Sequence, residues 1–196
     1  GKTIVNLSRT FLDTNGVRNE IEVAVEDVKA DFPQPKFEGN TTKEKLINLL
    51  KSDNVASQQG MVEMFDSHVG ASTVLMPYGG KYQLTEEEAS VQKVPVLGKE
   101  SNTASIMTFG YNPFISEWSP FHGAAYAVVE SISKVIAVGG KWQGIRFSFQ
   151  EYFERLGNNT ETWGKPFSAL LGTLFVQKGF GLPAIGGKDS MSGTFN

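Results

Sequence analysis

The 196-residue chain contains no cysteine, which excludes disulfides, thiolate metal sites and cysteine nucleophiles within it. An excess of one charge is also lacking, because 18 basic and 21 acidic residues give a net charge of −3. Neither a nucleic-acid footprint nor a polybasic membrane patch is therefore evident. No apolar run approaches the roughly 20 residues that cross a bilayer. We expect no nucleic-acid or membrane partner, and the missing cysteines suit a reducing, cytoplasmic setting.

Aromatic residues are plentiful, and the chain can build a core. Fourteen Phe and three Trp stand within a hydrophobic fraction of 40%, which argues against disorder. The length fits one domain, or one domain plus a piece of a neighbour. Residues 31–40 hold two prolines and a glycine close together, so we place a boundary there and expect the main domain over 41–196. The start at Gly1 and the end at Asn196 suggest a piece of a larger protein.

Periodicity and capping signals predict a mixed set of elements. Strands are expected over 2–7, 20–25, 72–76, 90–97, 104–109 and 182–185. Helices are expected over 41–51, 57–65, 123–138, 148–156 and 166–178. Thr41 with Glu44, and Ser148 with Glu151, have capping-box spacing at two of these helix starts. Strands come before helices without regular βαβ alternation, which favours the α+β class.

The most informative segment is Leu-Pro-Ala-Ile-Gly-Gly-Lys-Asp-Ser-Met-Ser-Gly at 182–193. We interpret it as a strand ending at Gly186 and Gly187, followed by a tight turn. Paired glycines let a backbone approach a ligand closely, and successive N–H groups in a turn can bind an anion. Lys188 and Ser190 suit a phosphate, and Asp189 suits a hard divalent cation. The spacing is not that of a Walker loop.

A second candidate site lies at the start of the helix expected from Gly123. A helix N-terminus presents free N–H groups and a positive dipole end, so a phosphate could rest on Gly123 and His122. The alternative is that the proline and glycine of Ser119-Pro-Phe-His-Gly only shape the entry into a core helix.

Acidic residues offer a third candidate. Glu130 and Lys134 are spaced i, i+4, which is an ordinary helical ion pair. Because their helical neighbours are small and apolar, a cation joining Glu130 to Asp189 is the competing interpretation. Glu88 ends an acidic run, which is either a solvated turn or a source of a metal ligand.

Three stretches resemble one family. Asn-Thr-Ala-Ser-Ile-Met-Thr-Phe-Gly-Tyr-Asn-Pro (102–113), Ser-Pro-Phe-His-Gly-Ala-Ala-Tyr-Ala-Val-Val-Glu-Ser (119–131) and Pro-Ala-Ile-Gly-Gly-Lys-Asp-Ser-Met-Ser-Gly (183–193) resemble phosphoribosylformylglycinamidine synthase. This is the amidotransferase of purine biosynthesis, and the likeness covers nearly the whole chain.

The resemblance implies a fold and an activity. That family has two tandem halves resembling aminoimidazole ribonucleotide synthetase, followed by a glutaminase domain. Residues 41–196 look like the N-terminal subdomain of the second half, and 1–40 like the tail of the preceding subdomain plus a linker. The implied sheet, mixed or antiparallel, packs on helices and can pair into a barrel with a partner subdomain. The implied reaction converts formylglycinamide ribonucleotide, glutamine and ATP to formylglycinamidine ribonucleotide.

The resemblance also implies site residues and partners. An auxiliary ATP or ADP site with Mg²⁺ would take its metal ligands from Asp189, Glu130 and Glu88. Lys134 stands where the family has an asparagine ligand, and it could neutralise a phosphate directly. The partners would be the other domains of the synthase, and the isolated piece could self-associate.

Two alternatives stay open. One is a degenerate structural domain that binds no nucleotide and supports the catalytic half. The other is a self-standing phosphotransferase of the same superfold, against which the missing closing subdomain argues.

Overall fold

The computed structural model describes residues 1–13, 20–34, 36–64 and 72–193. Its helices are α1 (Arg9–Asp13), α2 (Thr42–Leu50), α3 (Gln59–Val62), α4 (Pro113–Trp118), α5 (Pro120–Ala137) and α6 (Thr160–Phe180), with a short 3₁₀ turn at Trp142–Gly144. Its strands are β1 (Tyr78–Gly79), β2 (Thr85–Glu86), β3 (Ala89–Lys93), β4 (Ala104–Thr108), β5 (Phe147–Glu154) and β6 (Ala184–Gly193).

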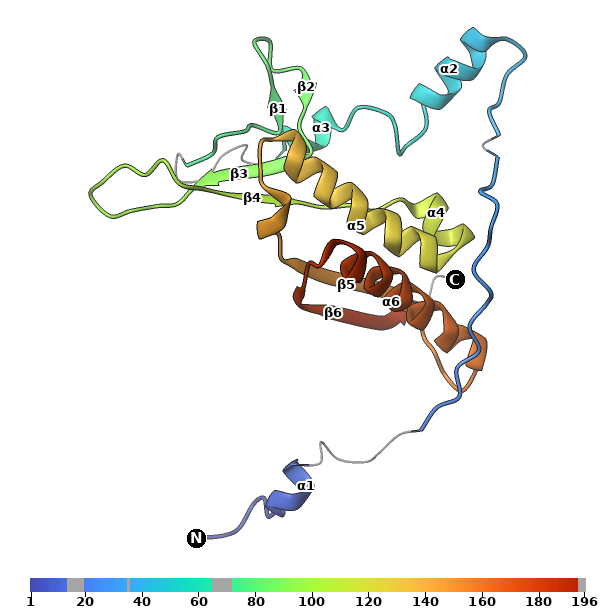
Figure 1. Cartoon of the computed structure of the whole chain (residues 1–196), viewed down its shortest axis with the longest axis vertical. Coiled ribbons are helices and arrows are strands. Elements are labelled where there is room, and N and C mark those ends of the chain that lie inside the picture. Colours follow the sequence, from blue (N-terminus) through green and yellow to red (C-terminus); the bar gives the residue numbers. More distant parts are fainter. Residues whose placement is uncertain (14–19, 35, 65–71, 194–196) are drawn as a thin grey trace.

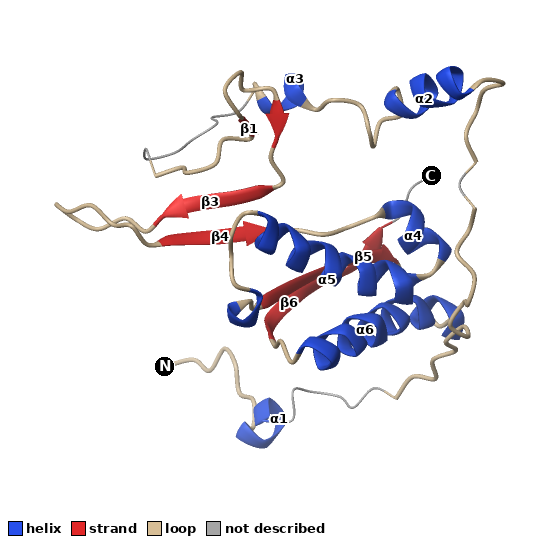
Figure 2. Cartoon of the chain, turned by 45° about the horizontal axis from the view of Figure 1, so that its top comes forward, coloured by secondary structure: helices blue, strands red, loops and turns tan. Residues whose placement is uncertain are grey.

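The core lies where helices α5 and α6 pack together against the parallel strands β5 and β6 (Figures 1 and 2). Its buried members come from α5, β5, α6 and the connection between α6 and β6: Val128, Ile132, Phe147, Val176 and Leu182. A two-stranded sheet cannot bury an apolar face alone, so the two helices supply the covering layer. The result is a mixture of helices and small sheets, as the sequence predicts.

Strands β3 and β4 form an antiparallel hairpin that projects from the body, with Val91 opposite Ile106 (Figure 2). Val91 is its buried residue, and the end of β4 lies on α5, where Thr108 Oγ1 donates to the Ser131 carbonyl at 2.8 Å. The expected strands over 90–97 and 104–109 are thus confirmed, each with a shorter span. Of the expected strand 72–76, only an isolated bridge between Thr73 and Gln92 forms.

Helix α2 begins where its capping box predicts. Thr41 accepts the N–H of Glu44 at its side chain, and Glu44 accepts the N–H of Thr41 in return. Helices α5 and α6 begin earlier than expected, because Ser119 and Asn159 cap them. Pro166, expected at a helix start, lies inside α6. That helix ends at Gly181, whose φ of 67° is the left-handed conformation that glycine adopts readily.

The expected helix over 148–156 is wrong, because this stretch is strand β5. Less exposed and more exposed residues alternate from Phe147 to Phe153, and β6 supplies the backbone partners. The capping-box spacing of Ser148 and Glu151 is therefore overridden by a strand that lies far away in sequence. The expected strands over 2–7 and 20–25 are also wrong: neither range contains a strand, and α1 follows the first.

The predicted turn after Gly186 and Gly187 is wrong as well, because β6 runs through it to Gly193. Gly187 lies so close to β5 that a Cβ there would clash with the Phe149 carbonyl oxygen. Gly186 has a φ of 154° where the register of the two strands shifts. Both glycines thus serve the pairing of β5 with β6.

Residues 20–34 run as an extended segment along the ends of α5 and α6 (Figure 1). The Ala24 N–H donates to the Thr160 carbonyl at 3.1 Å, and Lys29 Nζ donates to the Trp118 carbonyl at 2.6 Å. The ring of Phe32 lies 4.8 Å from that of Trp118. This segment, which reaches into the predicted boundary at 31–40, is therefore attached to the body.

No helix within the described ranges is long and apolar enough to cross a bilayer.

Candidate functional site

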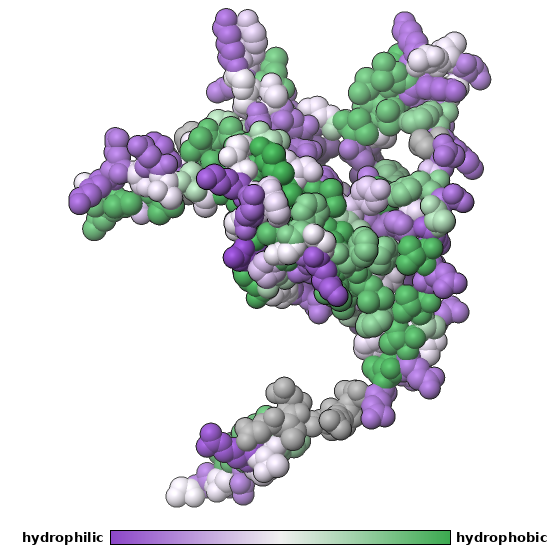
Figure 3. Space-filling view, viewed as in Figure 1, coloured by the Kyte–Doolittle hydropathy of each residue, from purple (hydrophilic) through white to green (hydrophobic). Residues whose placement is uncertain are grey.

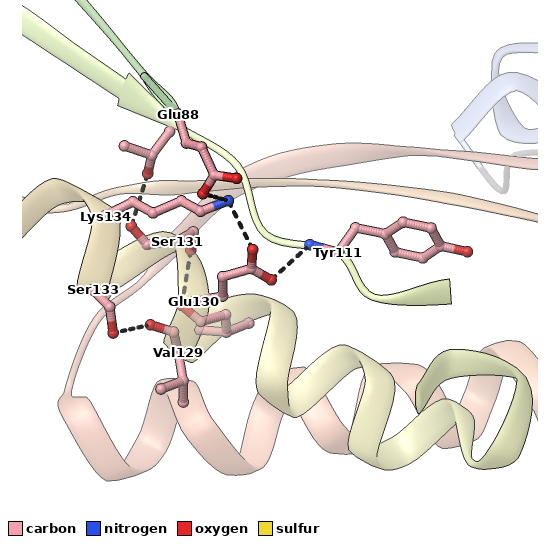
Figure 4. Close-up of polar contacts among 9 residues, drawn as sticks. Glu88, Tyr111, Val129, Glu130, Ser131, Ser133 and Lys134 are labelled. Atoms are coloured by element: carbon pink, nitrogen blue, oxygen red, sulfur yellow. Dashed lines mark hydrogen bonds and ion pairs between the residues drawn. The ribbon is translucent and has the colours of Figure 1, made fainter. Parts of the chain in front are cut away.

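A connected polar cluster joins Lys134 to Glu88 and Glu130 (Figure 4). Lys134 Nζ lies 2.8 Å from Glu88 Oε2 and 2.7 Å from Glu130 Oε1. Glu130 and Lys134 occupy successive turns of α5, and Glu88 immediately precedes β3. Two of the three predicted metal ligands are thus brought together on one lysine.

The loop between β4 and α4 closes this cluster. The backbone N–H of Tyr111 donates to Glu130 Oε2 at 3.1 Å, so both oxygens of that carboxylate have partners. Lys134 Nζ lies 4.5 Å from the centroid of the Phe109 ring. The Lys134 side chain is only 13% exposed, whereas that of Glu88 is 59% exposed.

The electrostatics keep this lysine charged. Burial alone would lower the pKa of Lys134, but its hydrogen bonds to Glu130 and Glu88 and their charges outweigh burial and raise it. A protonated lysine offers three N–H donors and no acceptor, so it cannot ligate a metal. The ammonium therefore stands where a cation between the two carboxylates would stand.

The predicted metal set does not fit a magnesium ion in this arrangement. Across residues 1–13, 20–34, 36–64 and 72–193, no group of three or more His, Asp or Glu side chains is arranged to hold a metal. Glu88 and Glu130 are engaged with Lys134, whereas Asp189 lies on β6 opposite Glu151 of β5. Magnesium binding by these three carboxylates stays a prediction that no contact described here supports.

Strand β6 carries the second candidate group. Lys188 Nζ donates to Ser190 Oγ at 2.7 Å, and both residues lie on one face of the strand. Asp189 falls on the opposite face, which separates it from the two predicted phosphate contacts. Because these residues belong to a strand and not to a turn, the concavity of backbone N–H groups expected at Gly186 and Gly187 is not formed by a turn.

The carboxylate pair on the other face is unusual. Burial, with the charge of Asp189 added to it, raises the pKa of Glu151 to about 7. Two carboxyl groups in register on neighbouring parallel strands repel each other when both are ionised. Sequence reasoning missed this pair, because it assigned Glu151 to a helix.

His122 and Gly123 take part in packing. His122 Nδ1 lies 2.9 Å from Ser119 Oγ, and its ring contacts those of Phe32, Trp118 and Phe121. A Cβ at Gly123 would clash with Ser116 of α4. These contacts support the alternative that the motif shapes the helix entry, and a phosphate contact here stays a prediction.

One groove was not expected from the sequence. It has a volume of about 820 Å³ and lies between the segment that holds Ala24–Lys29 and helices α4 and α6. At Gly164 a Cβ would clash with the Ala24 carbonyl oxygen, which explains the glycine inside α6. The signal that could have revealed it is this glycine in an otherwise helical pattern.

Comparison with known proteins finds relatives in the same family that the three motifs resemble. Phosphoribosylformylglycinamidine synthase subunit PurL of Methanobrevibacter smithii is 28% identical over 143 residues, covering 71% of this chain and 17% of that protein. The subunit PurL of Pyrobaculum calidifontis is 29% identical over 164 residues, covering 82% of this chain and 21% of that protein. The subunit PurL of Pyrobaculum aerophilum is 35% identical over 99 residues, covering 50% and 13% respectively.

The fold agrees with these sequence matches. The solved structure of PurLQS from Thermotoga maritima superposes with a TM-score of 0.60 at 15% identity, covering 92% of this chain and 25% of that chain. No protein-family model matches the sequence. The chain spans about a fifth of the length of the curated relatives named above. Together with the three motifs, these matches show that the chain is homologous to a segment of phosphoribosylformylglycinamidine synthase.

Proposed function

We propose that the chain is part of an ATP-dependent ligase of purine biosynthesis and contributes a nucleotide-facing wall to it. The ligase would convert formylglycinamide ribonucleotide, glutamine and ATP to formylglycinamidine ribonucleotide, ADP, phosphate and glutamate. The sequence matches to subunit PurL support this assignment. In the proposed assembly the chain acts with a first synthetase-like half and a glutaminase domain, and it is inactive alone.

The observation that carries the nucleotide role is the exposed face of β6. Lys188 presents its ammonium beside the Ser190 hydroxyl, and both groups can donate to phosphate oxygens. Gly186 precedes them on the same face without a Cβ atom that would keep a ligand away. We place ADP or ATP of the second, auxiliary site against this face.

Magnesium enters the proposal only as the usual companion of nucleotide phosphates. Its predicted ligand on β6 is Asp189, which lies on the opposite face from Lys188 and Ser190 and would reach a phosphate-bound Mg²⁺ only if this end of β6 rearranged. His122 and Gly123 would extend the phosphate contacts only if the Ser119 cap and the aromatic packing rearranged.

The domain role rests on exposed apolar side chains. Met107 of β4 is 74% exposed and Phe109 just after it is 65% exposed, and apolar residues are visible among hydrophilic ones on the hairpin (Figure 3). We propose that residues 41–196 are the N-terminal subdomain of the second half. Its β3–β4 hairpin would pair into a barrel with a partner subdomain, and residues 1–40 would end the preceding subdomain. Without that partner, the same surface favours self-association.

A second candidate is a scaffold that binds no nucleotide. The closed state of Glu88, Glu130 and Lys134 favours it, because the carboxylates expected to serve a metal have an internal partner. The two candidates differ in whether β6 contributes to nucleotide binding.

The test is equilibrium binding of ADP to the full-length synthase by calorimetry, with wild type compared with Lys188→Ala. We expect the variant to lose one class of nucleotide site or to weaken it at least about tenfold, since charge-assisted phosphate contacts are worth 1.5–3 kcal/mol. Lys178→Ala, an exposed lysine at the end of α6, is the matched control and should bind as wild type does. Unchanged stoichiometry and affinity in Lys188→Ala would support the scaffold instead.

A further inference from the structure

We propose that Lys134 is a built-in cation that takes the place of a divalent metal between Glu88 and Glu130, so that this cluster works without metal. The cluster then fastens the turn before β3 and the loop after β4 onto helix α5. This inference does not depend on nucleotide binding at β6.

The charges of the cluster come first. Glu88 and Glu130 approach each other from different elements, and each is within 2.8 Å of the same ammonium. Two carboxylates held this close would repel each other without a cation between them. Since the lysine is 13% exposed, its charge is compensated mainly by these two groups and little by water.

The surroundings of the ammonium discriminate between a lysine and a metal. Magnesium demands a shell of about six oxygen ligands at about 2.0–2.1 Å. On one side of Lys134 Nζ lies the ring of Phe109, at 4.5 Å from its centroid, which offers no oxygen. An aromatic face is a poor neighbour for a hydrated divalent ion but a favourable one for an ammonium.

The hydrogen-bond donors of the Lys134 ammonium and the carboxylate oxygens around it also favour a lysine over a metal. Two of the three ammonium N–H groups can be assigned to Glu88 and Glu130, and the ring faces the same nitrogen. The second oxygen of Glu130 accepts the Tyr111 N–H. A metal at this position would have to displace the lysine and compete with that hydrogen bond.

Further contacts beside the cluster hold the same segments on α5. One turn away, Thr108 Oγ1 donates to the Ser131 carbonyl, and a Cβ at Gly110 would clash with the Ala127 carbonyl oxygen. The end of β4 therefore lies directly on α5 over two turns of the helix (Figure 4). The lysine is the charged centre of this contact.

The first test measures Mn²⁺ binding to the full-length protein without nucleotide, for wild type and for Glu88→Gln. Calorimetry reports the binding directly, and the midpoint of thermal unfolding reports whether Mn²⁺ stabilises the protein. We expect either no binding or binding that Glu88→Gln leaves unchanged, which places that metal elsewhere. Wild-type Mn²⁺ binding that disappears in Glu88→Gln would overturn the proposal.

The second test is a gain of function. Lys134→Gln removes the ammonium and offers an amide oxygen, so we expect Mn²⁺ to bind and to raise the unfolding midpoint with its concentration. The double variant Lys134→Gln with Glu130→Gln should lose that gain. A folded Lys134→Gln protein that gains no Mn²⁺ response would refute the claim that the lysine holds a metal's place. If the variant does not fold, the comparison of wild type with Glu88→Gln still decides.

A failed nucleotide experiment is distinguishable from a failure here. Lys188→Ala reports on β6 alone, whereas Glu88→Gln and Lys134→Gln report on the cluster at α5.

Discussion

The clusters at α5 and β6 contain the same kinds of residue, lysine and carboxylate, yet they are arranged in opposite ways. At α5 the Lys134 ammonium lies between two carboxylates and under an aromatic ring. At β6 the Lys188 ammonium has one neutral partner, Ser190, and Asp189 lies on the other face of the strand. A charge with its partners inside the chain stabilises the fold, whereas an exposed charge with a neutral neighbour is available to a ligand. The difference separates the residues that build this segment from those that could serve its function.

The largest difference between the two clusters is expected from a substitution of Lys134. Lys134→Met should lower the free energy of unfolding by about 2 kcal/mol, because two carboxylates then face each other without a cation. The estimate lies below that for a fully buried pair, since Glu88 is 59% exposed. Urea unfolding at neutral pH with a chelator measures it. Lys141→Met, an exposed lysine after α5, is the control and should change stability by less than about 0.5 kcal/mol. Equal effects in the two variants would contradict a special role for Lys134.

The carboxylate pair on β5 and β6 gives the next effect, through pH. Burial and the charge of Asp189 raise the folded-state pKa of Glu151 from its ordinary value of 4.5 to about 7, so between these pH values the native state holds more protons than the unfolded state. Its contribution is therefore fully present below about pH 4.5 and is lost as the pH rises through 7.

Glu151→Gln should reduce the loss of unfolding free energy between these pH values by an amount on the order of 1 kcal/mol. The expected difference is this small because solvent reaches the pair and screens its charges. Chemical unfolding of wild type and variant from pH 4.5 to 8 measures the difference across the window set by this pKa. Glu100→Gln, an exposed residue before β4, should leave the profile as it is. A Glu151→Gln profile with the wild-type slope would show that the pair is ionised without cost.

The smallest effect is expected where the same chemistry is exposed. Lys165 of α6 binds Glu154 of β5, with side chains that are 52% and 43% exposed. The hydrogen bond from Lys165 lowers the pKa of Glu154, so its contribution exists at neutral pH and is lost as the pH falls through the folded-state pKa. Lys165→Met should cost no more than about 0.5 kcal/mol at neutral pH, measured by urea unfolding. A loss of unfolding free energy as large as that of Lys134→Met would contradict the distinction between ion pairs that are shielded from solvent and pairs that are exposed.

Local signals predicted what local contacts decide. The capping box at Thr41 was predicted correctly, because both hydrogen bonds lie within three residues of it. The same spacing at Ser148 misled, because the state of that stretch depends on β6, beyond the whole of α6. Likewise the pair of Glu130 and Lys134 follows from i, i+4 spacing, whereas Glu88 and Phe109 reach it only through the tertiary fold.

The β6 segment also shows that tertiary pairing cannot be predicted from local sequence. The sequence draws attention to its polar residues behind two glycines, but interpreting them as a turn put Lys188 and Asp189 on one surface. Once the segment is a strand, its alternation divides them between two faces. The residue types could be found from the sequence, and their common direction could not.

The extended segment 20–34 is joined to helices α4 and α6 by contacts between residues that are far apart in sequence. Its hydrogen bond from Lys29 to Trp118 spans 89 positions, so closing that loop costs chain entropy that only the assembled helices can repay. The segment would accordingly dock late in folding, after α5 and α6 have met. A protein cut at the proline-rich stretch would leave the aromatic rings of Trp118 and His122 without Phe32. Residues that composition assigns to the linker and the preceding subdomain therefore complete the aromatic packing at the start of α5.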